Sequence, residues 1–156
     1  MGNKGLLEAI QLAIQAERAA QQFYLDAAAK TVNPQGKAFL LELAGFEAYH
    51  EEKLLALVDS LSASKYFKYE GRELVLPKSE GGVRVRKEPH PQEMAGILGM
   101  AMDAEKKAQE RYKALAEGTA DPAGKAMFER LAQEEAVHNR ILSDEFYTLS
   151  NKGRWV

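Results

Sequence analysis

The sequence contains an internal repeat: residues 16–54 align without gaps with residues 104–142, at an offset of 88 residues. Of the 39 aligned positions, 17 carry the same residue in both copies. A repeat of this kind predicts two copies of one supersecondary unit that pack on each other, because one copy alone cannot bury its apolar face. The chain is therefore expected to fold into two equivalent halves.

Both copies have the apolar spacing of helices. Stripes of apolar residues three or four positions apart predict four helices, at about residues 5–30, 33–61, 91–118 and 121–150. Asn33 and Asp121 are good N-caps, each followed by proline at the first helical position, and Gly118 indicates the end of the third helix. The connections within each copy are short, so each copy is expected to be an antiparallel hairpin.

We expect a single domain over residues 1–156, with a hairpin at 5–61, a crossover at 62–90 and a second hairpin at 91–150. The crossover has ample length to run back along a helix. It contains two apolar segments (74–76 and 83–86) for which two interpretations stay open, short strands or docking on a second subunit. An aromatic and lysine-rich stretch at 65–69 is interpreted as packed aromatics with solvated lysines in preference to a nucleic-acid or docking patch. The predicted fold class is all-α, an antiparallel four-helix bundle of two repeated helical hairpins.

Composition excludes several classes of function. A formal net charge of −2 over 156 residues gives no reason to expect nucleic acid or an anionic membrane as partner. No apolar run approaches the roughly 18 residues of a membrane helix, and the first residues are not expected to act as a signal peptide. The sequence has no cysteine, which excludes disulfides and thiolate metal sites. We therefore expect a cytoplasmic protein.

Four glutamates stand out because each interrupts an apolar helical stripe: Glu17, Glu47, Glu105 and Glu135. They form two pairs related by the repeat. The other glutamates are expected on solvated faces or rims, and these are Glu8, Glu42, Glu51, Glu52, Glu110, Glu117, Glu129 and Glu134. Four ionised carboxylates inside one bundle are prohibitive unless something compensates their charge.

Two divalent cations would neutralise the four carboxylates and leave two histidines as neutral nitrogen ligands. His50 and His138 each follow a glutamate by three residues, which places both side chains of each Glu-x-x-His motif on one side of the helix. A carboxylate can then bridge two metals while an imidazole binds one of them. The alternative is that both histidines are core residues hydrogen-bonded to the glutamates.

Four motifs carry a resemblance to a known family: Ala16-Glu17-Arg18 with Phe23-Tyr24, Glu47-Ala48-Tyr49-His50, Ala104-Glu105-Lys106 with Tyr112, and Glu135-Ala136-Val137-His138. With them the chain resembles ferritin-like di-iron carboxylate proteins, and within that superfamily the rubrerythrin-like group. The resemblance implies a ferritin-like bundle, two iron ions, and reaction with hydrogen peroxide or dioxygen. The implied metal ligands are Glu17, Glu47, His50, Glu105, Glu135 and His138.

The chain departs from rubrerythrins in two respects. It lacks the four cysteines of their rubredoxin-like domain, and it has Ala108 where they tend to place a further carboxylate. Tyr24 and Tyr112 are candidates for hydrogen bonds that orient the carboxylates, although core packing explains them equally well. Gln21 and Gln109, which are also repeated, are further candidates for that role.

The leading functional hypothesis is a rubrerythrin-like oxidoreductase that reduces hydrogen peroxide or dioxygen and protects against oxidative stress. Carboxylate and imidazole ligands suit iron, while manganese or zinc would also bind in isolated protein. Electrons would come from an external donor such as a rubredoxin-like or flavin protein, and the long crossover favours a small homo-oligomer, a dimer. The alternatives are a ferroxidase or iron storage or delivery protein of ferritin type, an oxygenase with an organic substrate, and a structural metal bundle.

Overall fold

The computed structural model describes residues 3–62 and 90–155. They form four helices: α1 (Asn3–Lys30), α2 (Pro34–Ser62), α3 (Pro91–Gly118) and α4 (Pro122–Lys152). The predicted all-α fold and its four helices are confirmed. The candidate strands and the aromatic stretch of the crossover lie outside the described residues. None of the described helices has an apolar segment long enough to cross a membrane.

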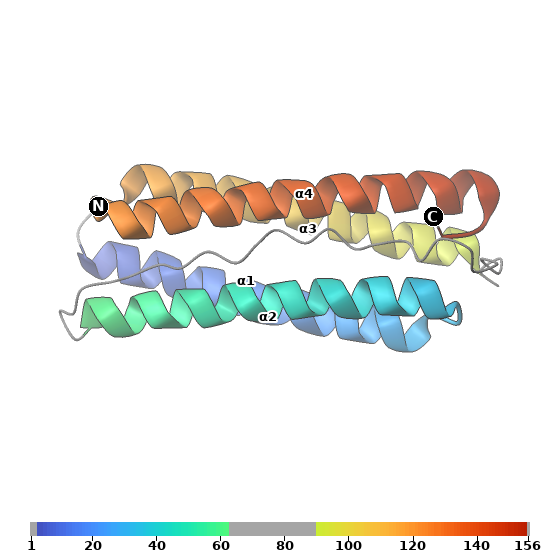
Figure 1. Ribbon diagram of the computed structural model, residues 1–156, viewed down its shortest axis with the longest axis horizontal. Helices are drawn as coiled ribbons and strands as arrows, with labels where there is room; N and C mark the ends of the chain where they lie inside the picture. Colours follow the sequence, from blue (N-terminus) through green and yellow to red (C-terminus); the bar gives the residue numbers. More distant parts are fainter. Residues whose placement is uncertain (1–2, 63–89, 156) are drawn as a thin grey trace.

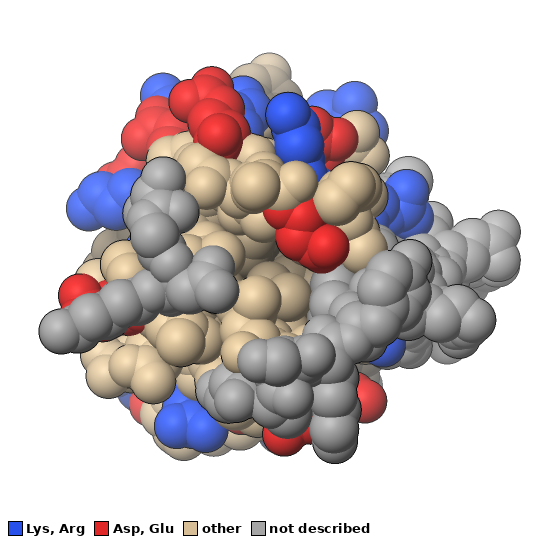
Figure 2. All heavy atoms as spheres, turned by 90° about the vertical axis from the view of Figure 1, so that its left-hand side faces the viewer, with Lys and Arg blue, Asp and Glu red and all other residues tan. Residues whose placement is uncertain are grey.

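The two hairpins form two layers of a bundle, and all four helices run nearly parallel to its long axis (Figure 1). α1 packs chiefly on α2 and α3 chiefly on α4, whereas α1 meets α3, and α2 meets α4, through fewer contacts. α2 ends at the opposite end of the bundle from the start of α3, which agrees with a long crossover (Figure 1). At the end where α1 begins, charged side chains of both signs are interspersed around the rim and uncharged ones occupy the middle (Figure 2).

The repeat extends to the way in which each hairpin starts its second helix. The Asn33 carboxamide oxygen accepts from the backbone N–H groups of Gln35 and Gly36, at 2.8 and 3.2 Å. The Asp121 carboxylate accepts from the N–H of Gly124 at 2.7 Å. Both predicted N-caps are thus confirmed, because each side chain satisfies N–H groups that a helix leaves unpaired.

The third helix ends where expected but is capped differently. Gly118 is its last residue, and the cap is Thr119, which has extended backbone and donates its hydroxyl to the carbonyl of Leu115 at 2.5 Å. The repeat-related Thr31 donates to the carbonyl of Ala27 at 2.7 Å. Threonine therefore closes both hairpin turns, and Gly118 does not act as a left-handed glycine cap.

The hydrophobic core is divided into two clusters along the bundle axis. In α1, Leu6, Ile10 and Ile14 belong to one cluster, and Tyr24 and Ala28 belong to the other. All four helices contribute to both clusters. Because α1 places Glu17 between its two apolar segments, the predicted polar site lies in the middle of the bundle with apolar packing on either side.

The C-terminal segment joins the two hairpins. Trp155, which is 2% exposed, packs against Phe39 of α2 with 6.0 Å between ring centroids. The indole also lies directly over Gly36, where an added Cβ would come within 2.2 Å of the ring. Glycine is required at this position because the indole approaches the α2 backbone closely.

Candidate metal centre

The six predicted metal ligands lie together at the midpoint of the bundle. Their side chains are all buried, with exposed fractions between 0 and 3%. Each hairpin provides two carboxylates and one imidazole. The contributing residues are Glu17 of α1, Glu47 and His50 of α2, Glu105 of α3, and Glu135 and His138 of α4.

The ligand atoms form two overlapping groups, within each of which one atom from every residue lies within 4.8 Å of the others. The first group is Glu17, Glu47, His50 and Glu135, and the second is Glu47, Glu105, Glu135 and His138. Glu47 and Glu135 occur in both groups, so both carboxylates would be shared if each group held one ion. Each of the two other carboxylates and each imidazole belongs to one group only.

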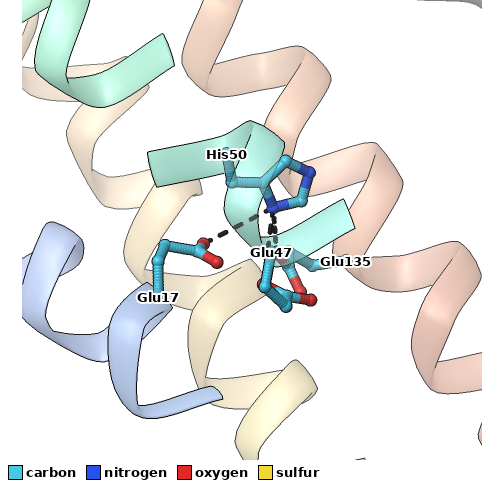
Figure 3. A group of neighbouring side chains, drawn as sticks. All are labelled: Glu17, Glu47, His50 and Glu135. Atoms are coloured by element: carbon cyan, nitrogen blue, oxygen red, sulfur yellow. Dashed lines mark ion pairs between the residues drawn. The ribbon is translucent and has the colours of Figure 1, made fainter. Parts of the chain in front are cut away.

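Both histidines face the carboxylates through Nδ1. The His50 Nδ1 atom lies 2.7 Å from Glu135 Oε1, 3.5 Å from Glu17 Oε1 and 3.6 Å from Glu47 Oε2 (Figure 3). The His138 Nδ1 atom lies 3.4 Å from the nearest Glu47 oxygen. The two imidazole rings are stacked, with 6.0 Å between their centroids. Each hairpin therefore directs one ring nitrogen into the carboxylate cluster.

The polar atoms of the cluster do not satisfy one another. Each of the six residues has at least one buried nitrogen or oxygen without a hydrogen-bond partner in the described part of the chain. This includes both Nδ1 atoms, because the short contact of His50 with Glu135 lacks hydrogen-bond geometry. Buried polar groups without partners are costly. Two divalent cations would neutralise the carboxylates and bind these atoms, so the residues fit a two-metal centre better than a hydrogen-bonded polar core.

Crowding of the carboxylates shifts their proton affinities. Burial, together with the charges of Glu105 and Glu17, raises the pKa of Glu47 well above its ordinary value. Burial lowers the pKa of His50, but the hydrogen bond with Glu134 and the nearby carboxylates of Glu17 and Glu47 outweigh it and raise that pKa well above the usual range. Both shifts favour the protonated forms of Glu47 and His50 in the metal-free cluster, and metal binding would release those protons.

Two tyrosines connect the ligands of the two hairpins. The Tyr24 hydroxyl of α1 donates to Glu105 Oε1 of α3 at 2.5 Å, and the Tyr112 hydroxyl of α3 donates to Glu17 Oε1 of α1. Each tyrosine thus orients the glutamate of the other repeat, not the one two turns away on its own helix. Burial and the neighbouring carboxylate charges raise the pKa of both tyrosines well above the ordinary value, so both hydroxyls stay protonated.

The two repeated glutamines, Gln21 and Gln109, do not form the predicted hydrogen bonds with the six candidate ligands in the described part of the chain. Gln21 donates from Nε2 to Glu51 Oε2 at 3.4 Å, and Arg18 donates to the same oxygen at 3.0 Å. Gln109 is half-buried and makes no hydrogen bond to the six predicted ligands among the residues described here. Neither glutamine contacts the centre in the way that the sequence suggested.

Glu134 was expected on a solvated face, and that prediction is wrong. Its side chain is buried, and its Oε2 lies 2.6 Å from Nε2 of His50, the ring nitrogen that points away from the carboxylate cluster. Arg130 donates to the other oxygen, Oε1, at 3.3 Å. These contacts outweigh burial and lower the pKa of Glu134. Such a carboxylate fixes the orientation of a metal-binding imidazole and increases its basicity.

A comparison of the two repeat copies indicates that position 134 faces the inside of the bundle. The equivalent position in the first hairpin is Phe46, an apolar residue on the inner side of α2. Its ring packs edge-on against the imidazole of His138, with 4.9 Å between centroids. Positions 46 and 134 therefore face the histidine of the opposite hairpin, one with an aromatic ring and the other with a carboxylate.

A cavity of about 340 Å³ opens onto the centre between α1 and α3. Its floor is formed by four buried glutamates of the predicted ligand set. Exposed residues at its outer side include Met100 and Lys107. Small molecules can therefore reach the cluster from this face of the bundle.

Comparisons with known proteins agree with this architecture. The rubrerythrin family matches residues 96–153. A hypothetical protein from Pyrococcus furiosus is 30% identical, with a TM-score of 0.74 over 94% of this chain and 90% of that one. A two-domain protein from Anabaena variabilis, with DJ-1/ThiJ/PfpI-like and ferritin-like domains, has a TM-score of 0.72 at 14% identity, over 97% of this chain and 39% of that one. No curated protein matches the sequence.

The fold and the buried carboxylate and histidine cluster define a ferritin-like four-helix bundle with a candidate metal site. The match to the rubrerythrin family lies within this bundle and covers the part of the chain that contains Glu105, Glu135 and His138. The resemblance carried by the two Glu-x-x-His motifs is confirmed at this level.

Proposed function

We propose that this protein is a non-haem di-iron oxidoreductase that reduces hydrogen peroxide or dioxygen with electrons from an external donor. The observation that carries the proposal is the pair of overlapping ligand groups, which share Glu47 and Glu135. Carboxylate oxygens with one imidazole per metal suit Fe(II). Two Fe(II) ions would supply one electron each, so that one hydrogen peroxide and two protons yield two molecules of water.

The residues of the chain have distinct parts in this proposal. Glu47 and Glu135 would be the carboxylates that both ions share, and two ions held in this way can act together on one bound oxidant. Glu17 with His50, and Glu105 with His138, complete the two positions. Tyr24 orients the carboxylate of Glu105, and Tyr112 orients that of Glu17. Both hydrogen bonds connect α1 with α3.

The external donor, the small oligomer and the cytoplasmic location belong to the same proposal. With no cysteine in the sequence, electrons cannot come from a cysteine-ligated iron centre in this chain. A rubredoxin-like or flavin protein is the donor class that we propose, and a homodimer is the assembly. A role in protection from oxidants follows from the peroxide reaction.

Anaerobic loading with Fe(II) followed by hydrogen peroxide tests the proposal. Stopped-flow absorbance should show oxidation of two Fe(II) per peroxide, faster than for free Fe(II), with repeated turnover when a chemical reductant is supplied. The Glu47→Ala/Glu135→Ala double variant is the control and should behave like free Fe(II). Oxidation no faster than in that control would contradict the enzyme.

The ferritin-type alternative predicts a different assembly. A hollow shell would be required to accept many irons per chain, whereas a dimer cannot enclose a mineral core. Light scattering of the purified protein, combined with the number of irons retained per chain, separates the two. A large shell holding far more than two irons per chain would favour storage over peroxide reduction.

A further inference from the structure

We propose that the cavity between α1 and α3 binds an organic carboxylate with an apolar body, whose charged group lies at Arg111 and Lys107. Both residues line the cavity together with Phe23 and several alanines. The ligand would lie between the surface of the bundle and the metal centre. This binding site goes beyond the proposed function and does not depend on it.

The repeat explains why there is space at this seam. α1 and α3 face each other with alanine at two pairs of repeat-related positions, Ala16 with Ala104 and Ala20 with Ala108. All four alanines line the cavity. Small side chains on both helices leave a void where larger ones would interdigitate. The carboxylate that rubrerythrins tend to have at position 108 is thus replaced by part of an open wall.

The two walls differ chemically where the repeat has diverged. Ala19 and Phe23 of α1 correspond to Lys107 and Arg111 of α3, and all four residues line the same cavity. One wall is therefore apolar, while the opposite wall carries two cationic side chains. Such a combination fits a ligand with an apolar body and one anionic group.

The size of the cavity favours an organic ligand over peroxide or dioxygen alone. A water molecule occupies about 30 Å³ in the liquid, so a cavity of about 340 Å³ is much larger than peroxide or dioxygen, each with two heavy atoms, would require. Sites for small organic ligands begin at about 300 Å³ and are mostly apolar with a few polar groups. The cavity meets both conditions.

Charge determines which way the ligand lies. The floor consists of Glu17, Glu47, Glu105 and Glu135, all buried, while Lys107 is exposed and Arg111 half-buried. A carboxylate is repelled by the floor of the metal-free protein and attracted to the two cations near the surface. The apolar body then extends past the alanines toward the centre.

Calorimetric titration with sodium octanoate tests the site, with octan-1-ol as the neutral probe of the same length. Both metal-free and zinc-loaded proteins are used, because zinc is redox-inactive and the result is then independent of peroxide chemistry. Arg111→Gln should weaken octanoate binding about fivefold to tenfold and Lys107→Ala about twofold to threefold. Neither variant should change octanol binding.

Two further variants make the test specific. Lys106→Ala removes the neighbouring lysine, which does not line the cavity, and should leave octanoate affinity unchanged. Ala108→Leu should fill the cavity and weaken both probes by at least tenfold, while circular dichroism and zinc stoichiometry show that the fold persists. Absence of saturable octanoate binding to the parent protein, or equal losses in Lys106→Ala and Lys107→Ala, would overturn the inference. Octanoate binding without peroxide reduction would contradict only the proposed function.

Discussion

The two hairpins provide the same polar groups to the centre but surround them differently. In the first hairpin, Nε2 of His50 contacts Glu134, which also accepts a hydrogen bond from Arg130. In the second hairpin, the imidazole of His138 packs against the ring of Phe46 instead. Duplication thus preserved the groups that face the candidate metal centre, while the neighbours of those groups diverged. The two metal positions are expected to be chemically unequal for this reason.

The largest effects should follow from removing shared and unshared ligands. Glu135→Ala takes a carboxylate from both ligand groups, so zinc content after loading and desalting should fall from two ions to near zero. Glu17→Ala and Glu105→Ala each affect one group and should leave about one ion. If Glu17→Ala removed both ions, the division into two positions would be wrong.

Glu134→Gln tests the inequality of the two ends directly. Loss of the charged partner of His50 should weaken the metal position of that histidine by about 10- to 100-fold. Cobalt(II) titration followed by visible absorbance should then resolve one tight and one weak site. Phe46→Leu at the equivalent position is the matched control, and a comparable loss in that variant would remove the distinction between the ends.

A second comparison concerns two repeat-related glycines. An added Cβ at Gly36 would lie 2.2 Å from the Trp155 ring, whereas at Gly124 its nearest neighbour is a Thr119 methyl at 3.2 Å. Gly36→Ala should therefore destabilise the fold by about 1–3 kcal/mol, as expected for overpacking, and Gly124→Ala by less. Urea unfolding measures both. The only tryptophan of the sequence reports displacement through a red-shifted emission in Gly36→Ala alone.

The metal-free protein should lose stability as the pH rises. The pKa of His50 is raised in the folded state, so its contribution is complete below the unfolded value of about 6.5 and is lost as the pH rises through the folded value. The raised pKa of Glu47 acts with the same sign. Urea unfolding at about pH 6 and pH 9 should show the decrease, and Glu134→Gln should reduce it. An unchanged decrease in that variant would contradict the role of Glu134.

The smallest effect is expected at the edge of the site. Arg18 is 60% exposed and forms an ion pair with Glu51 at 3.0 Å. The equivalent residues of the second hairpin are Lys106 and Asn139, which do not have opposite charges. Exposed pairs contribute about 0–1 kcal/mol. Arg18→Ala should therefore change the free energy of unfolding by less than about 1 kcal/mol and leave metal content unchanged. A larger loss would show that this pair supports the first hairpin in a way that the second lacks.

Sequence was sufficient for the helices and for the clustering of the six polar residues. Helix period and repeated caps depend on local interactions, and four carboxylates on apolar stripes have few physical solutions. The partners of Tyr24 and Tyr112 were not predictable in the same way, because both hydrogen bonds cross from one hairpin to the other. The burial of Glu134 was not predicted, because Glu134 is next to Glu135 in the sequence and adjacent residues usually lie on different sides of a helix. The packing of α4 in the bundle buries both side chains.

The sequence by itself determined that there are two matching hairpins, each with two carboxylates and one imidazole of the polar cluster, because repeat register and helix period are properties of the chain. Only the tertiary structure decided how the hairpins are docked. Docking places Glu134 behind His50 and Phe46 against His138, and it leaves the cavity between α1 and α3. These features depend on distances between helices far apart in sequence, which side-chain packing across the interface sets.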